Sequence, residues 1–266
     1  MIINQASKDY IKNLAEFIAE DYSEGTETNL YKILEDENIS LFHDHYENYF
    51  DGMLVYSNNH FYIHLNLDKG NLPGTPRERF SLAHELGHLF IEEHYRGLIN
   101  GDFNGHPSKF ELKRDNKLEI EADQFAAYLL MPSQRFKEAC KNKPFSFGLI
   151  KELGNAFKTS KLSTIIRFTD PDAGTYPLMV SFFQNQKLKW FILSNDFPYK
   201  AFKTKIGKPP PPTSVLGEYY DDSEAKYTGI ERIYADDWFY TDSSQELNEQ
   251  CFYSNYGYDI SMIWPD

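Results

Sequence analysis

The chain has 266 residues, a formal net charge of −13, an apolar fraction of 41% and many aromatic side chains, with 19 Tyr and 21 Phe. This length suffices for one large domain or two modest ones, and the apolar content indicates a folded protein rather than a disordered one. The acidic charge argues against broad contact with a nucleic-acid backbone or an anionic membrane surface.

The cysteines and the N-terminal residues indicate where the protein resides. Cys140 and Cys251 are too few and too far apart for a disulfide framework. The start, "MIINQASKDY", lacks the basic and apolar regions of a signal peptide. No apolar run approaches the roughly 20 residues that a membrane span needs. We therefore expect a soluble, cytoplasmic protein without membrane contacts.

The first third of the chain mixes helical and strand patterns. "DYIKNLAEFIAEDY" and "NLYKILEDE" each predict a helix, and "DGMLVYSNNHFYIHLNLD" predicts a hairpin that turns at Ser57–Asn59. The second strand of the hairpin, "HFYIHLN", alternates between its two faces. We expect this strand to offer an edge to which an extended substrate could add.

The next helix has a well-specified start. Thr75 can cap it, Pro76 fits the first helical position, and Glu78 completes the spacing of a capping box. The helix carries "SLAHELGHLFIEEHY", from Ser81 to Tyr95. The glycine-rich stretch that follows predicts a mobile loop over residues 96–109.

Further helices occupy the middle of the chain. "RDNKLEIEADQFAAYLLMP" predicts a long helix that Pro132 ends, and Ser133 can cap a short one that ends near Cys140. "SFGLIKELGNAFKTSKLSTIIRF" then predicts two short helices joined at Thr159–Ser160, a small helical module at about 146–168.

Strand patterns dominate from Pro177 onward. "PLMVSFFQNQKLKWFIL" predicts a hairpin, "KPPPP" a stiff spacer, and "GIERIY", "CFYSNYGY" and "ISMIW" further strands. The predicted fold class is therefore α+β. A mostly helical domain with a small antiparallel sheet occupies residues 1–170, and a β-rich region of unknown role occupies residues 171–266.

The motif "HELGH" carries the most specific chemistry in the chain. His84 and His88 lie four residues apart on the predicted helix, so both side chains project from one face and can bind one zinc ion. Glu85 lies beside them, where a carboxylate can act as the general base. The competing interpretation is an amphipathic helix whose histidines are hydrogen-bonded in a polar groove.

A third protein ligand must come from elsewhere in the chain. His94 follows His88 by six residues, but Ile91 stands where a metzincin has a helix-breaking glycine. If the helix continues, His94 lies about 240° around the axis from His88. We therefore expect His94 to be a surface or capping residue.

The helix near residue 120 offers a better ligand. Glu119 and Asp123 share one face, so Glu119 can bind the metal while Asp123 accepts the free N–H of a ligand histidine. Glu121 points about 200° away from Glu119 and remains the alternative ligand. Small residues, Gly87 and Ala122, allow the two helices to approach closely.

Together these motifs match a known family. "RFSLAHELGHLF" followed by "EIEADQFAAYLLMP" closely resembles the ImmA/IrrE family of bacterial and phage metallopeptidases, and the resemblance covers roughly residues 50–168. It implies that His84 and His88 are zinc ligands, that Glu85 is the catalytic base, and that Glu119 or Glu121 is the third ligand. It also implies a protein substrate of the helix-turn-helix repressor or antitoxin type.

The predicted mechanism is zinc-dependent endopeptidase cleavage, although manganese or iron could occupy the same ligands. An additional donor should stabilise the oxyanion, and Tyr128, His60 and His64 are candidates.

Two other classes of function remain open. "LGNAFKTSKLSTIIRF" has the spacing of a helix-turn-helix, with Lys158, Lys161 and Arg167 nearby. No extended basic face accompanies it, so we expect a packing module rather than a DNA-binding one. The other alternative is a regulatory protein with an inactive or sensory metal site. Glu85 has no role in a structural zinc site, which favours the enzyme.

Overall fold

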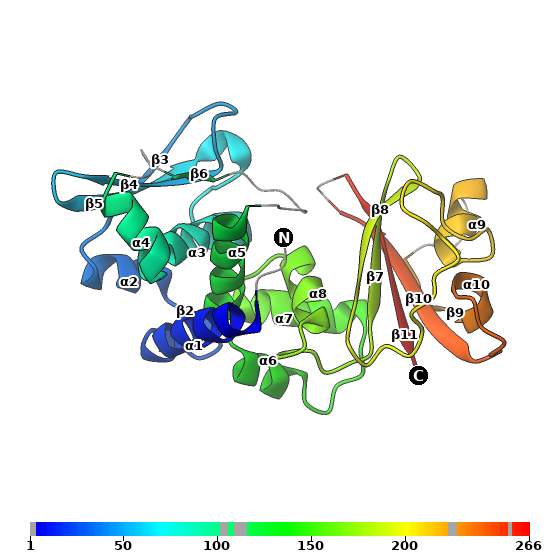
Figure 1. The fold of residues 1–266 in the computed structure, drawn as a ribbon. Coiled ribbons are helices and arrows are strands. Elements are labelled where there is room, and N and C mark those ends of the chain that lie inside the picture. The colour runs from blue at the N-terminus through cyan, green and yellow to red at the C-terminus, as the bar shows by residue number, and fades with distance from the viewer. Residues whose placement is uncertain (1–3, 102–105, 109–115, 223–227, 255–256) are drawn as a thin grey trace. The chain divides into compact units, whose positions relative to one another are not determined.

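The structure is a computed structural model of the chain (Figure 1). It describes residues 4–101, 106–108, 116–222, 228–254 and 257–266. Contacts divide the chain into two compact units, the first made of residues 1–139 and 151–163 and the second of residues 140–150 and 164–266. The boundary at residue 170 that the sequence predicts concerns separately folding domains, and it stays a prediction.

Most of the helices belong to the first unit, and α6, α7 and α8 contribute residues to both units. The elements up to residue 169 are α1 (Gln5–Asp21), β1 (Ser23–Glu24), β2 (Glu27–Thr28), α2 (Leu30–Asp36), β3 (Ser40–Asp44), β4 (Gly52–Ser57), β5 (His60–Asn66), a 3-10 turn (Leu67–Lys69), α3 (Pro76–Phe90), α4 (Glu92–Ile99), β6 (His106–Ser108), α5 (Lys117–Leu130), α6 (Ser133–Cys140), α7 (Phe147–Phe157) and α8 (Lys161–Thr169). The predicted helices and the hairpin are confirmed.

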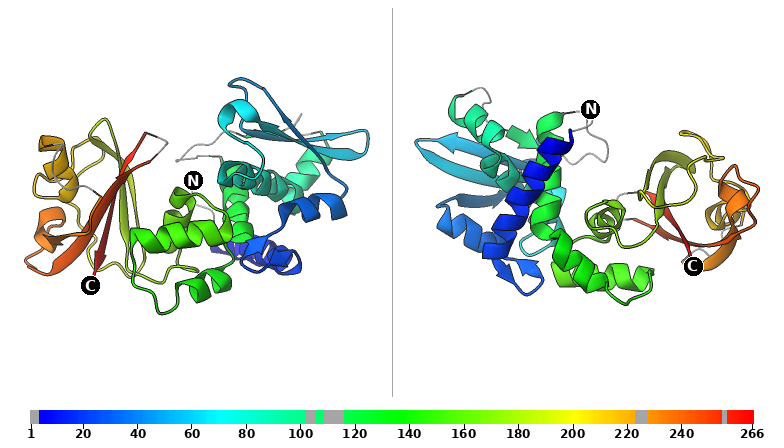
Figure 2. Two further views of the ribbon diagram at one scale, coloured as in Figure 1. Left: turned by 180° about the vertical axis from the view of Figure 1, so that it is seen from behind. Right: turned by 60° about the horizontal axis from the view of Figure 1, so that its bottom comes forward.

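Helix α5 is the centre of the first unit, because both α1 and α3 pack against it. In the right-hand view of Figure 2, α1 (blue) lies alongside α5 (green). The contact with α3 is close because Gly87 has no side chain. A Cβ atom there would lie 3.1 Å from the Cα atom of Ala122 and 3.2 Å from the Cβ atom of Phe125. The predicted close approach of the two helices is confirmed, and it brings the motif on α3 next to the motif on α5.

A four-stranded sheet covers α3 on another side. Its strand order is β3-β5-β4-β6, with β3 parallel to β5 and the other pairs antiparallel, so the sheet is mixed. The hairpin turns at Asn58 and Asn59, both with positive φ, which asparagine tolerates better than most residues. Leu54, Ile63 and Leu65 are fully buried, and β4 and β5 contact α3.

The position of β5 contradicts one expectation. This strand, "HFYIHLN", pairs with β3 on one side and with β4 on the other. Residues 62–66 pair with β3, and residues 60–65 pair with β4, so the strand is internal to the sheet and offers no free edge for a substrate strand along most of its length. Within the described residues, the outer strands of the sheet are β3 and β6.

Two sets of hydrogen bonds, one from Thr75 and one from Glu78, stabilise the start of α3. The Thr75 hydroxyl accepts from the backbone N–H of Glu78 at 3.2 Å, as a helix cap does. The Glu78 carboxylate, instead of returning to the Thr75 N–H, accepts from Gly74 N–H at 2.9 Å and bonds to Tyr31 and His43. The predicted capping box is thus only half formed, and the buried glutamate anchors the helix start to α2 and β3.

The segment after α3 is more ordered than the sequence predicts. Residues 96–99 of the predicted loop belong to a helix, α4, which begins at Glu92 after the chain leaves the helical conformation for one residue at Ile91 (φ −75°, ψ 113°). Residues 106–108 form β6. Residues 102–105 and 109 of the predicted loop lie outside the described residues.

The second unit is built on an antiparallel sheet with the order β8-β7-β11-β10-β9. Its elements from residue 170 are β7 (Met179–Gln184), β8 (Lys187–Leu193), α9 (Val215–Asp221), β9 (Glu231–Tyr234), α10 (Ala235–Trp238), β10 (Glu246–Tyr253) and β11 (Asp259–Pro265). The predicted hairpin and the strands at "GIERIY" and "ISMIW" are confirmed, whereas only the first three residues of "CFYSNYGY" belong to a strand, β10, and residues 255–256 lie outside the described residues. The two short helices were not expected, and they cover a core that contains Leu216, Trp238 and Cys251.

A buried carboxylate ties these helices to the sheet. Glu249 on β10 has no exposed surface. It accepts hydrogen bonds from the Ser261 hydroxyl at 2.7 Å, the Val215 backbone N–H at 3.0 Å and the Trp238 indole at 3.1 Å. Burial raises the pKa of the Glu249 carboxyl, because the charged form loses its hydration. The cluster joins β10, β11, α9 and α10 at one point.

The proline run does not behave as a free spacer. Pro210 and Pro211 are buried, and the Lys208 carbonyl accepts from the Leu188 N–H of β8 at 2.8 Å. A Cβ atom on Gly217 of α9 would lie 2.0 Å from the Pro211 carbonyl oxygen, so the run packs directly against this helix. The segment is part of the second unit rather than a link between domains.

The fold class is α+β, as the sequence predicts. Within the described part of the chain, none of the helices combines the length and the apolar character that crossing a membrane requires.

Candidate metal centre

Two histidines of α3 meet at the buried face of the helix. His84 and His88 are 2% and 1% exposed, and their Nε2 atoms lie 3.2 Å apart. The spacing of four residues places them one turn apart, and Thr75 and Pro76 determine where the helix starts and so which side chains face inward. Two imidazole nitrogens therefore face the same small volume.

Helix α5 adds a carboxylate to this volume. The two oxygens of Glu119 lie 3.5 Å from His84 Nε2 and 3.4 Å from His88 Nε2. One ligand atom from each of the three residues lies within 4.8 Å of the others. Zinc at about 2.0–2.1 Å from tetrahedral ligands separates those ligands by about 3.3 Å. The observed separations fit such an ion.

A second carboxylate of α5 orients one of the histidines. Asp123 Oδ1 lies 2.8 Å from His84 Nδ1, on the side of the ring away from Glu119. A carboxylate in this place keeps the proton of a neutral imidazole on Nδ1 and leaves the Nε2 lone pair for a metal. The contact that the spacing of Glu119 and Asp123 predicts is therefore present.

Glu121, the alternative ligand, lies elsewhere. Its Oε2 atom is 3.1 Å from His94 Nε2, and Lys117 Nζ lies 3.6 Å from its Oε1 atom. Lys117 also bonds to Glu93 at 2.9 Å, which lowers the pKa of the Glu93 carboxyl and raises that of the lysine. The structure thus places Glu119, and not Glu121, beside the two histidines of α3.

His94 corrects another expectation. It is 1% exposed, and its Nδ1 atom lies 3.1 Å from Nδ1 of His88. The expectation that it lies at the surface is wrong because it assumed a continuous helix through Ile91. The single extended residue at this point redirects the chain and returns His94 to the back of the His88 ring.

Glu85 is fully buried beside the first strand of the hairpin. A Cβ atom on Gly52, the first residue of β4, would lie 2.6 Å from Glu85 Oε1. The glutamate side chain therefore occupies space that any larger residue at position 52 would take. The backbone of β4 confines the carboxylate that the motif predicts as the general base.

Ser108 of β6 is a contact that sequence reasoning missed. Its hydroxyl lies 3.1 Å from His84 Nε2, and its carbonyl accepts from the Asp51 N–H at 2.7 Å. The surrounding sequence, rich in glycine and polar residues, predicts only a loop. β6 pairs with β4, which is distant in sequence, and the local sequence pattern does not predict this pairing.

The three residues considered for oxyanion stabilisation have other surroundings. Tyr128 is 1% exposed and packs in the core of the first unit. His60 bonds to the Ser40 hydroxyl at 2.9 Å, and His64 bonds to the Tyr46 hydroxyl at 2.8 Å. The two histidines alternate with the buried Ile63 along β5, so they belong to the face of the sheet opposite to α3.

The basic residues of the helical module do not form one surface. Lys158 and Lys161 are exposed, but Arg167 is 2% exposed and bonds to Asp170 at 3.1 Å. A buried, paired guanidinium cannot neutralise a phosphate backbone. This arrangement agrees with the expectation that the module packs rather than binds DNA.

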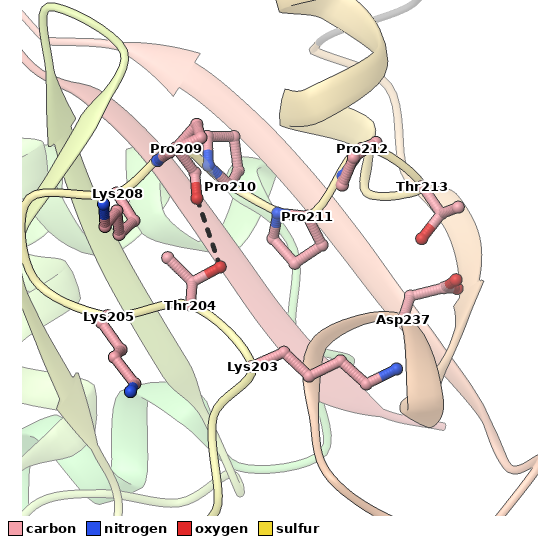
Figure 3. A pocket seen from close by; sticks show the side chains of 10 residues that line it. All are labelled: Lys203, Thr204, Lys205, Lys208, Pro209, Pro210, Pro211, Pro212, Thr213 and Asp237. Carbon is pink, nitrogen blue, oxygen red and sulfur yellow. Dashed lines mark hydrogen bonds between the residues drawn. The ribbon is translucent and has the colours of Figure 1, made fainter.

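The second unit contains an open hollow of about 400 Å³ beside the proline run (Figure 3). It is lined by Lys203, Thr204, Lys205, Lys208, Pro209, Pro210, Pro211, Pro212, Thr213 and Asp237. The Thr204 hydroxyl donates to the Pro209 carbonyl at 3.3 Å, the dashed bond in Figure 3, and Lys203 bonds to the Asp236 carbonyl. These hydrogen bonds stabilise the conformation of the loop. The polar groups of the hollow do not converge on one point, unlike His84, His88 and Glu119 in the first unit.

Comparisons with known proteins place the buried cluster in a segment that matches a peptidase family. The sequence model of the Peptidase_M78 family, described as an IrrE N-terminal-like domain, matches residues 32–169, a little over half of the chain. A solved structure described as a Mycobacterium tuberculosis transcriptional regulator has a TM-score of 0.59 and 12% identity, with 98% of this chain and 80% of that chain covered. At this identity the likeness shows the fold alone.

The comparison with curated proteins returned no match. The matched segment contains the hairpin, α3, α4 and α5, and with them every residue of the buried cluster. The chain therefore belongs to the Peptidase_M78 metallopeptidase family.

Proposed function

We propose that the protein is a zinc-dependent endopeptidase with His84, His88 and Glu119 as metal ligands and Glu85 as the general base. One observation carries the proposal, namely the convergence of two imidazole nitrogens and a carboxylate within 4.8 Å, deep in the first unit. Such a cluster of acceptors stabilises a cation and is costly without one. The set of two histidines and one glutamate is typical of catalytic zinc rather than of structural zinc.

The surrounding residues support a hydrolytic role. When bound, zinc supplies the Lewis acidity that activates water and polarises the scissile carbonyl. A Glu85 carboxylate oxygen takes the proton of the attacking water and delivers it to the leaving amide nitrogen. Asp123 keeps the His84 proton on Nδ1, and Gly52 leaves room for the Glu85 carboxylate.

The substrate is a protein, and we propose a specific regulatory protein such as a helix-turn-helix repressor. The fold neighbour that is a transcriptional regulator is compatible with a role in transcription control. The net charge of −13 suits a basic, DNA-binding partner, which it would attract over long range.

The first test is metal content by mass spectrometry on protein purified without an affinity-tag metal. We expect about one zinc per wild-type chain and a loss of zinc in Glu119→Ala. Glu121→Ala, offered zinc in excess, should retain one zinc per chain because Glu121 contacts His94 instead. Glu92→Ala, which removes an exposed glutamate of α4, is the control. A wild-type chain that carries no metal after zinc is offered would disprove the proposal.

A further inference from the structure

A second buried pair of residues lies directly behind the His88 ring. His88 directs its Nε2 atom toward His84 and Glu119, and its Nδ1 atom toward Nδ1 of His94, at 3.1 Å. The centres of the His88 and His94 rings are 5.0 Å apart. Both rings are almost completely buried, so water does not replace this contact.

The contact continues to a carboxylate. His94 Nε2 lies 3.1 Å from Glu121 Oε2, and Glu121 is 3% exposed. The other oxygen of Glu121 is 3.6 Å from Lys117 Nζ, which is partly exposed. A hydrogen-bonded series therefore runs from His88 through His94 to Glu121, and Glu121 is ion-paired with Lys117 nearer the surface.

The chemistry of imidazole allows one arrangement of protons in this series. A neutral histidine carries one ring proton, and only a nitrogen without a proton can bind a metal. If His88 binds through Nε2, its proton is on Nδ1 and is donated to Nδ1 of His94. The proton of His94 is then on Nε2, and Nε2 donates it to Glu121.

We propose that His94 and Glu121 are positioning residues that hold the ring orientation and the tautomer of His88 required for metal binding. The inference rests on the proposed metal site. Asp123 contacts the Nδ1 atom of His84 directly, at 2.8 Å, whereas Glu121 acts on His88 through the intervening ring of His94. The break at Ile91 makes the second arrangement possible, because it places His94 behind the ring.

The test compares the zinc affinity of the wild type with that of His94→Phe, His94→Gln and Glu121→Gln, by competition with a chromogenic chelator. Loss of an outer partner of a metal-bound histidine weakens metal binding by about 10- to 100-fold. We expect a loss of this size for His94→Phe, which keeps a ring but removes the acceptor. His94→Gln offers an amide oxygen to His88 Nδ1 and should recover part of the affinity.

A control is His60→Phe, which removes a partly buried histidine of the first unit that bonds to Ser40 and not to a proposed ligand. Its zinc affinity should equal that of the wild type within about twofold, since the 10- to 100-fold effect belongs to partners of a ligand. Circular dichroism of each metal-free variant checks that the helices form. If His94→Phe does not fold, His94→Gln and Glu121→Gln decide the test.

Nitrogen NMR of the histidine rings gives a readout that a purely structural role would not change. In zinc-loaded wild type we expect His88 to carry its proton on Nδ1 and His94 on Nε2. If the folded His94 and Glu121 variants bind zinc with the affinity of the wild type, the inference is wrong but the proposed function stands. The same holds if His94 in the zinc-loaded wild type carries its proton on Nδ1. A wild-type chain that binds no zinc would overturn the proposed function.

Discussion

The two units each bury a glutamate, and the two surroundings are opposite in kind. Glu249 in the second unit receives hydrogen bonds from a hydroxyl, a backbone N–H and an indole N–H, all donors. Glu119 in the first unit lies 3.4–3.5 Å from the Nε2 atoms of His84 and His88. Of these, His84 already places its other ring nitrogen against Asp123.

This difference separates a structural buried carboxyl group from the proposed metal ligand. The donors around Glu249 give the buried carboxyl oxygens hydrogen-bond partners, so the cluster is complete as a part of the core. Around Glu119 the Nε2 atoms of His84 and His88 act as acceptors when each ring donates from its far side, so three acceptors face one another, an arrangement that favours a cation between them. Burial alone does not identify a functional carboxylate, whereas the polarity of its neighbours does.

The largest expected effect comes from Glu85→Gln. The amide cannot take a proton from water, so we expect peptide hydrolysis to slow by about 10²- to 10⁴-fold. Zinc content should stay at the wild-type level, because Glu85 is not one of the three converging residues. Single-turnover cleavage of a substrate protein, followed by gel, measures the rate. Wild-type activity in a zinc-loaded variant would exclude Glu85 as the base.

Glu249→Ala should destabilise the second unit by about 2–4 kcal/mol, because it leaves buried donors without an acceptor. Glu249→Gln keeps a carbonyl for Val215 and Trp238 and an amide for the Ser261 oxygen, so it should cost less than about 1.5 kcal/mol at neutral pH. The three tryptophans, at positions 190, 238 and 264, all belong to this unit, so their fluorescence in urea reports its unfolding. Equal losses for both variants would contradict the role given to the donors.

Gly52→Ala tests how tightly β4 confines the Glu85 carboxylate. The added methyl group would lie 2.6 Å from Glu85 Oε1, so the carboxylate must move. A displacement of about 1 Å in a catalytic group can reduce the rate by about 10²-fold. We expect such a loss of activity with unchanged zinc content. Gly148→Ala, an exposed glycine at the start of α7, is the control. Full activity of Gly52→Ala would show that β4 does not confine the Glu85 carboxylate.

The smallest expected effect is a pH dependence. The pKa of Glu249 is higher in the folded protein than in the unfolded chain, so the folded state binds the proton more tightly. Its contribution to stability is fully present below the unfolded pKa of 4.5 and is lost as pH rises toward the folded pKa. The slope is at most about 1.4 kcal/mol per pH unit.

Other carboxyls titrate in the same range, so the quantity to measure is the stability of the wild type minus that of Glu249→Gln. This difference should fall as pH rises above 4.5. A difference that stays constant or rises with pH would mean that burial does not raise the pKa of this carboxyl.

Local patterns predicted most of the secondary structure. The cap at Thr75 and Pro76, the hairpin turn at Asn58–Asn59 and the end of α5 before Pro132 follow from residues adjacent in the chain. The two short helices of the second unit were missed, since α9 and α10 have four to seven residues and depend on burial against the sheet.

The sequence by itself determined which residues could bind a metal. Helical spacing puts His84 and His88 on one face, and Glu119 and Asp123 on one face, because 3.6 residues make a turn. The same periodicity separates Glu119 from Glu121. These results need no knowledge of how the helices pack.

Tertiary structure alone decided what surrounds that site. The chain leaves α3 at Ile91, so His94 lies behind His88 rather than at the surface. Pairing of β6 with β4 brings Ser108 to His84, and pairing of β3 with β5 removes the edge that the hairpin seemed to offer. Each of these outcomes depends on contacts between residues that are distant in sequence. Local sequence patterns do not report the free energy of such contacts.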